Sequence, residues 1–355
     1  MKLAINLALS LGVLALCLWL VWPNAHARAA LEHTLRSLEL ATFWPTLAGT
    51  IGLLATTHFF RAWCWNNLLR PIDVSLPPGR LLAISSVGFM AILALPARLG
   101  EFVRPALLRQ KGKVSASAVL GTVAVERIVD GLVVSLLVFG CCLALHLGNP
   151  VAEKYWMMPM AYASLGVFLA AMTFLGFALR WPQATVKLCM KISLLPRLAP
   201  GIAAKIEAKL FDLIRGFTVL KDGANLAWFG FWSILYWVAN GLSVYVLARG
   251  MGLDLSVVGA FATMGIVAVG ISLPNSPGLV AQFHILTTLG LSLYLGDAVA
   301  NTTGLAYAIV LHGLQVAWYV GVGAVAMFSS HVSLADVLAS RRAIPEEMGL
   351  SKEPA

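Results

Sequence analysis

A short charged motif at the edge of a long apolar run carries side chains suited to hold a charged ligand. It consists of Glu126, Arg127 and Asp130. In a helix Glu126 and Asp130 share one face at i and i+4, whereas Arg127 points about 100° away. Each such charge near the centre of a bilayer costs about 2.5–3.5 kcal/mol on insertion scales. The motif therefore predicts either a functional polar lining or a structural clamp at the membrane interface.

A second charged group precedes this motif and surrounds a glycine. Arg98, Gly100, Glu101 and Arg104 follow a proline at position 96. With the first motif they give three positive and three negative charges, so a mutually paired, neutral network is feasible in the membrane. Two interpretations stay open: a gate that opens and re-pairs as a lipid headgroup passes, and a clamp that ties this segment to the next helix.

A third polar segment follows another apolar run that ends at a proline. Its candidate substrate-binding residues are Asn275, Ser276, Pro277, Gly278, Gln282 and His284. If each proline marks the tip of a re-entrant hairpin, the second limb begins inside the membrane. Its free N–H groups and positive dipole end then favour an anion. Glycine lets the backbone approach a ligand, and Arg98 adds a guanidinium suited to phosphate. A packed proline kink is the structural alternative.

Other polar residues of the apolar runs predict structural roles. His58 and Arg61 lie near the end of a run, where snorkelling to the interface explains them. His312 is interpreted as a hydrogen-bonded core histidine. The chain contains no G-x-S-x-G, Walker A or HExxH motif and no metal-ligand spacing, so no enzyme, cofactor or metal is expected.

The composition places these residues in a membrane protein. Of 355 residues 59% are hydrophobic and 12% charged, against about 45–50% and 25% in soluble domains. A spanning helix needs about 20 apolar residues. Spans are predicted at residues 3–22, 43–60, 128–147, 157–179, 226–247 and 303–328. The first run, followed by Ala25-His26-Ala27, also resembles a signal peptide, although its apolar core is longer than usual.

The basic residues set the predicted orientation. They gather in residues 98–113 and 180–221, and the positive-inside rule places both loops in the cytoplasm. Anionic lipids are then their expected partners, rather than nucleic acid. A full crossing by the short run 81–95 would put the first loop outside. A hairpin over 81–110 that enters and leaves from the cytoplasm removes this conflict, and eight full spans remain the alternative.

A repeated motif supports two related halves. Leu95-Pro96-x-x-x-Gly100 recurs as Leu273-Pro274-x-x-x-Gly278, 178 residues later. We expect an all-α inverted repeat: residues 1–150 with two spans, a hairpin and a third span; residues 151–328 with two spans, a hairpin over 257–295 and a last span; and a cytoplasmic tail over 329–355. Both termini are expected in the cytoplasm. Inverted repeats place a transport site near the middle of the membrane.

Three stretches resemble a known family: PARLGEFVR at 96–104, ERIVD at 126–130 and SPGLVAQFH at 276–284. They are similar to the flippase-like family named for the transmembrane region of lysylphosphatidylglycerol synthase. Leu279 stands where many members have a second glycine, and His284 where many have glutamate. No synthase domain is expected after residue 328, so the chain would not make lysyl lipid itself.

The resemblance implies a flippase of the bacterial cytoplasmic membrane, beside an enzyme of lipid synthesis. It would move an anionic or zwitterionic lipid of the phospholipid, polyprenyl-phosphate or glycolipid type. On this view Arg98→Ala and Asp130→Asn abolish translocation and leave the fold intact. The alternatives are an intramembrane enzyme that modifies a lipid headgroup with Glu126 or Asp130 as base, a proton-coupled solute transporter, and a non-transporting accessory subunit.

Overall fold

The computed structural model describes residues 25–94, 100–111, 114–145, 157–193, 195–198, 200–272, 277–329 and 332. All regular structure in these residues is helical, which confirms the predicted all-α fold of a multi-pass membrane protein. Four helices are long and apolar enough to cross a bilayer: α6 (Ala116–Leu145), α8 (Met157–Arg180), α12 (Gly223–Gly250) and α16 (Thr303–Met327). They overlap four of the predicted spans, and α8 and α12 contain theirs completely. The predicted span over 3–22 lies outside the described residues.

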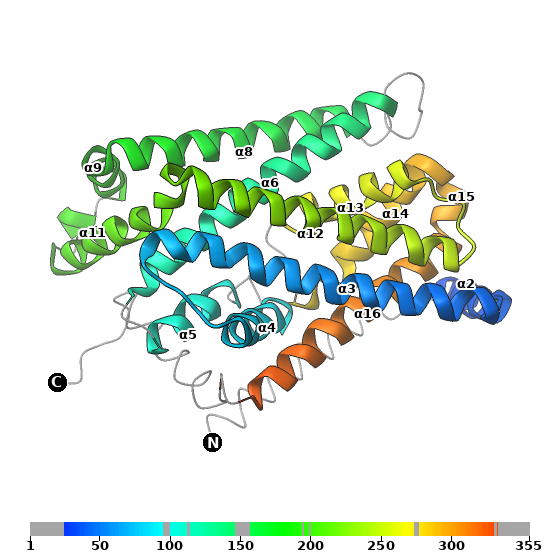
Figure 1. Cartoon of the computed structure of the whole chain (residues 1–355). Coiled ribbons are helices and arrows are strands. Elements are labelled where there is room, and N and C mark those ends of the chain that lie inside the picture. The colour runs from blue at the N-terminus through cyan, green and yellow to red at the C-terminus, as the bar shows by residue number, and fades with distance from the viewer. Residues whose placement is uncertain are drawn as a thin grey trace.

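The long helices form a bundle in which neighbours pack along much of their length. Helix α3 (Leu40–Leu69) packs along α12, and α6 packs along α8 (Figure 1). With 30 residues and a rise of about 1.5 Å each, α3 is about 45 Å long, and it contains the predicted span 43–60. Helix α2 (Ala25–Ser37) precedes it and packs against α16.

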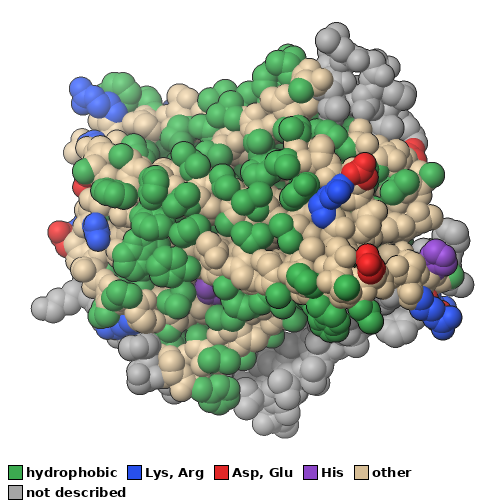
Figure 2. Space-filling model, turned by 45° about the vertical axis from the view of Figure 1, so that its right-hand side comes forward, with side chains coloured by type: hydrophobic (Ala, Val, Ile, Leu, Met, Phe, Trp, Pro, Cys, Tyr) green, Lys and Arg blue, Asp and Glu red, His purple; other side chains and the backbone are tan. Residues whose placement is uncertain are grey.

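Short helices gather at the two ends of this bundle. At one end lie α9 (Pro182–Ser193), α10 (Leu195–Leu198), α11 (Pro200–Arg215) and the 3-10 turn η3 (Gly216–Lys221), which hold the basic loop. At the other end lie α2 and α15 (Asp297–Ala300) (Figure 1). Hydrophobic side chains cover the middle of the face in Figure 2, with charged ones mostly toward its two ends. A protein that crosses a bilayer presents such an apolar band to the lipid and keeps its charged side chains near the two membrane surfaces.

Two apolar helices are shorter than the four long ones. Helix α4 (Pro78–Ala94) has 17 residues and α13 (Val257–Gly270) has 14. At about 1.5 Å per residue they measure about 26 and 21 Å, against about 30 Å of hydrocarbon. Each ends just before one of the two prolines. Helix α5 (Val103–Lys111) follows the short turn at residues 100–102, which we call the first bend, and packs on α4. Helix α14 (Val280–Leu295) follows the turn at residues 277–279, which we call the second bend, and packs on α13.

Residues 95–99 and 273–276, which hold the two prolines, lie outside the described residues. So do the candidate residues Arg98, Asn275 and Ser276. The re-entrant hairpins, the division into inverted repeats and the placement of both termini therefore stay predictions.

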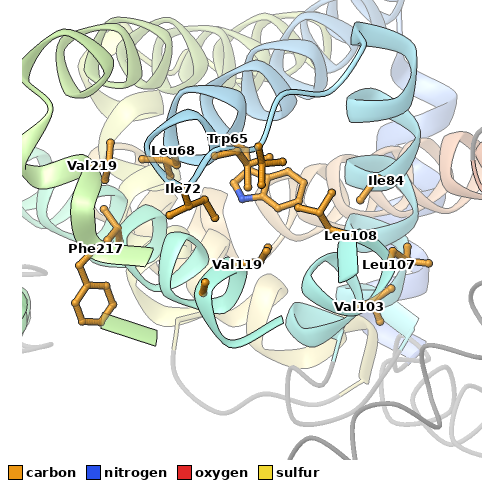
Figure 3. Packing of buried hydrophobic residues seen from close by; sticks show 14 of the residues in the cluster. Trp65, Leu68, Ile72, Ile84, Val103, Leu107, Leu108, Val119, Phe217 and Val219 are labelled. Carbon is orange, nitrogen blue, oxygen red and sulfur yellow. The ribbon is translucent and has the colours of Figure 1, made fainter. Parts of the chain in front are cut away.

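A buried cluster fixes the first bend segment to the bundle. The indole of Trp65 lies at its centre, with side chains from α3, α4, α5, α6 and η3 around it (Figure 3). Trp65 Nε1 donates to the hydroxyl of Thr122 on α6 at 3.1 Å, so its polar atom is satisfied although the side chain is fully buried. Leu107 and Leu108 of α5 are buried in the same cluster, which holds the short helix in place.

Gly100 is the closest point between the first bend and α4. A Cβ added to it would lie 2.2 Å from the carbonyl carbon of Ala91 and from the backbone nitrogen of Ile92. Neither backbone atom can move aside cheaply. We expect Gly100→Ala to lower the free energy of unfolding by about 1–3 kcal/mol through overpacking, measured by thermal unfolding in detergent. Gly140→Ala is the matched control, because nothing lies within 4 Å of its added Cβ; equal losses in the two variants would contradict this role for Gly100.

Candidate functional site

A buried ion network joins α3, α5 and α6. Glu126 lies between two arginines: its Oε1 is 2.8 Å from Nη2 of Arg61, and its Oε2 is 3.0 Å from Nη2 of Arg104. The side chains of Glu126 and Arg104 are 0% exposed. A charge buried so completely is tolerated only when it is paired and hydrogen-bonded, so these three residues form one unit.

Asp130 extends the unit toward α12. It pairs with Nη1 of Arg61, and its other oxygen accepts hydrogen bonds from the hydroxyl of Ser233 at 3.1 Å and from Nε1 of Trp237 at 3.3 Å. Arg61 thus binds two carboxylates at once, which the planar guanidinium allows and an ammonium group would not match. The three partners hold the carboxylate of Asp130 in one orientation.

The more accessible pair joins α6 to the first bend. Arg127 Nε lies 3.2 Å from Oε2 of Glu101, and their side chains are 32% and 14% exposed. The described network therefore holds three arginines and three carboxylates, with no net charge. Arg61 takes the place in this sum that the sequence analysis gave to Arg98. The interpretation of Arg61 as a snorkelling residue was wrong: it is buried, and its partners come from another helix.

Aromatic rings cover the arginines. The guanidinium of Arg61 lies 4.8 Å from the ring centre of Tyr236, and that of Arg104 lies 4.8 Å from Trp65 and 5.4 Å from Phe89. Cation–π contacts of desolvated arginines contribute about 2 kcal/mol each. They also exclude water, which strengthens the ion pairs beneath them.

The network lies deeper in the membrane than its sequence position predicts. The charged motif was expected at the edge of a span that starts at residue 128, but α6 begins at Ala116. Asp130 is the fifteenth of the 30 residues of α6, and Tyr236 is the fourteenth of the 28 residues of α12. Both therefore lie at the middle of helices that are long enough to span.

A cavity of about 100 Å³ opens beside Asp130, and we call it the first chamber. Its lining includes Arg61, Arg127, Asp130, Tyr236 and Ser272. Two basic groups and one acidic group therefore face the same small space. Glu126 and Arg104 do not line it. We therefore distinguish this buried pair from Arg61, Arg127 and Asp130, which a ligand in the chamber could contact.

The second bend is anchored by a histidine. Gly278 and Leu279 both have positive φ, of 70° and 60°, a conformation that costs a leucine about 1–2 kcal/mol. His312 Nε2 lies 2.8 Å from the carbonyl oxygen of Gly278, so His312 is a hydrogen-bonded core histidine as expected. Its ring stacks on Phe283 and meets His284 edge-on, with centres 5.0 Å apart.

The described candidate residues 278–284 make contacts of their own and do not line the first chamber. Gln282 donates to the carbonyl of Gly270 at 2.7 Å, which ties α14 to the end of α13. Gly278, Gln282 and His284 are not among the residues that line the first chamber. Their roles in binding substrate, like that of Pro277, stay predictions. Within the described part of the chain no group of three metal-ligating side chains occurs.

Several residues of the site escaped the sequence analysis. Ser233, Tyr236 and Trp237 belong to an apolar, aromatic stretch of α12 that predicts only a span. The one available signal was the spacing of Ser233 and Trp237, which lie at i and i+4 and therefore share a helix face. A serine one turn from a tryptophan is common in membrane helices, so only the structure shows that both donate to Asp130.

Comparison with known proteins agrees with this picture. The profile of one protein family, described as "Lysylphosphatidylglycerol synthase TM region", matches residues 5–323. The match spans both halves of the chain and includes the charge network. Searches of curated proteins and of solved structures gave no match.

Proposed function

The chain belongs to the family of the lysylphosphatidylglycerol synthase transmembrane region, and we propose that it moves an anionic or zwitterionic lipid between the leaflets of a bacterial cytoplasmic membrane. The observation that carries the proposal is the first chamber. Two arginines and an aspartate face a cavity at the middle depth of the spanning helices, where a bare phosphate would otherwise meet hydrocarbon.

The network supplies a way to bind and release a phosphate. Arg61 is shared between Glu126 and Asp130, and a phosphate in the chamber presents the same kind of oxygens as Asp130. An arriving headgroup takes the place of Asp130 as the second partner of Arg61, while Glu126 holds the guanidinium in place. The departing headgroup is replaced by Asp130 again. Each state keeps Arg61 paired, and while the phosphate is bound Asp130 keeps its hydrogen bonds from Ser233 and Trp237, which lowers the cost of its buried charge.

Arg127 is the natural first contact for the headgroup. Its side chain is the most exposed arginine of the network, and it lines the chamber together with Arg61. Its partner Glu101 is also partly exposed, so this pair separates at lower cost than the buried ones. We place Glu101 and Arg127 at the entrance and Arg61 with Asp130 at the inner position. An enzyme of lipid synthesis would supply the lipid.

Reconstitution into liposomes tests this function. Vesicles carry a phosphatidylglycerol with a fluorescent group on its acyl chain, and dithionite destroys the fluorescence of the outer leaflet. We expect more loss with the protein than without it, assayed with and without a proton gradient. The recovered lipid is checked by mass spectrometry: an altered headgroup would indicate the enzymatic alternative, and uptake of a water-soluble solute without lipid movement would indicate a solute transporter.

A further inference from the structure

A second chamber of about 90 Å³ adjoins the first. The two share four lining residues, Tyr236, Trp237, Ala268 and Ile271. The second chamber is lined by residues of α12, α13, α14 and α16. It therefore extends from the first chamber, beside the ion network, toward helices of the second half of the chain.

The lining of the second chamber is mostly apolar, carries no charge and includes a few polar side chains. Its polar members besides the shared aromatic residues are Asn240, Thr263, Thr287 and Gln315. The hydroxyl oxygen of Thr263 is buried and has no hydrogen-bond partner among the described residues. Thr287 donates to the carbonyl of Phe283 at 2.7 Å, which leaves its oxygen free to accept. Amide and hydroxyl groups that donate and accept are matched to hydroxyl groups of a ligand.

These groups lie at a depth where unmatched polarity is costly. Thr263 is the seventh of the 14 residues of α13, and Gln315 is the thirteenth of the 25 residues of α16. A buried hydroxyl without a partner costs about 1–3 kcal/mol. An apolar residue of similar size at either position would avoid this cost, so these polar side chains in a mostly apolar lining indicate a polar occupant.

We propose that the second chamber binds the uncharged, hydroxyl-bearing part of an anionic lipid headgroup while the phosphate faces Arg61 and Arg127 in the first chamber. This inference rests on the proposed function and narrows its substrate. The volume equals that of about three water molecules in the liquid, which suits a glycerol-sized group. No carboxylate lines the chamber, so an aminoacyl headgroup with one or two ammonium groups would be buried without a counter-charge.

Three lipids with the same labelled acyl chain test the inference in proteoliposomes: phosphatidylglycerol, lysylphosphatidylglycerol and phosphatidic acid. We expect the wild-type protein to move phosphatidylglycerol at least tenfold faster than the lysyl lipid. The double variant Thr263→Val, Gln315→Leu should move phosphatidylglycerol about tenfold more slowly and phosphatidic acid at the wild-type rate. The unchanged rate for phosphatidic acid shows that the variant is folded. Thr173→Val, on the exposed side of α8, is the matched control.

Two results would overturn the inference: equal or faster movement of the lysyl lipid, or an equal slowing of all three lipids in the double variant relative to Thr173→Val. Native mass spectrometry of the purified protein with the three lipids gives a second readout that needs no transport. Selective retention of phosphatidylglycerol by the wild type, lost in the double variant, supports the chamber even if no lipid moves, in which case the proposed function alone fails. Retention without selectivity contradicts the chamber.

Discussion

Glu126→Gln is expected to lower the free energy of unfolding by about 3–5 kcal/mol. The carboxylate binds Arg61 at 2.8 Å and Arg104 at 3.0 Å inside a fully buried cluster. Glutamine keeps the shape but removes the charge, and so leaves Arg104 without its counter-charge. The guanidinium has two other nitrogens that already lack hydrogen-bond partners among the described residues, so the buried group loses the one carboxylate that it contacts directly. Thermal unfolding in detergent, followed by size-exclusion chromatography, measures the loss.

Glu32→Gln is the matched control for this loss. Glu32 also pairs with an arginine, Arg36, but both side chains are exposed, and exposed pairs contribute about 0–1 kcal/mol. If Glu126→Gln unfolds at the same temperature as Glu32→Gln, Glu126 is not the buried centre of the network and the separation between structural and ligand-facing charges is wrong.

Asp130→Asn is expected to reduce lipid translocation at least tenfold and to leave the folded protein stable. The asparagine oxygen still accepts from Ser233 and Trp237, and Arg61 keeps Glu126 as a partner. What disappears is the negative charge that exchanges with the phosphate, so the headgroup is bound without an equivalent group to displace it. Initial rates in the dithionite assay, normalised to reconstituted protein, measure the effect.

The retained melting temperature of Asp130→Asn distinguishes loss of function from loss of fold. A variant that unfolds as readily as Glu126→Gln would make Asp130 a structural residue. A stable variant with the wild-type rate would remove Asp130 from the transport mechanism.

The sequence predicted the helices well where lipid surrounds them. Runs of about 20 apolar residues form helices in a bilayer, because a helix satisfies the hydrogen bonds of its own backbone. The predicted spans 157–179 and 226–247 lie within α8 and α12, and those over 128–147 and 303–328 overlap α6 and α16. The predicted ends were less accurate, because charges were treated as membrane boundaries. Helix α3 continues to Leu69 beyond Arg61, and α6 begins at Ala116, well before Glu126, because these charges neutralise one another inside the bundle.

The candidate site could be predicted only in part for the same reason. Glu126 and Asp130 share a helix face, so their association followed from the periodicity of one helix. Arg61 lies 69 residues before Asp130, and no local pattern joins them. Pairing between distant helices depends on how the helices pack, which the sequence of either helix alone does not specify. Each chamber is likewise lined by residues of four or more helices. The sequence therefore contained no indication that these polar residues line the same cavity.

The most direct test of a headgroup path through the chambers blocks them without changing any charge. Ala268 lines both chambers, and Ala268→Phe would fill the space between them. Ala170→Phe is the control, because Ala170 is exposed near the middle of α8. In the dithionite assay with labelled phosphatidylglycerol, we predict that Ala268→Phe loses at least nine-tenths of the translocation rate while Ala170→Phe keeps the wild-type rate. Equal rates in the two folded variants would contradict passage through the chambers.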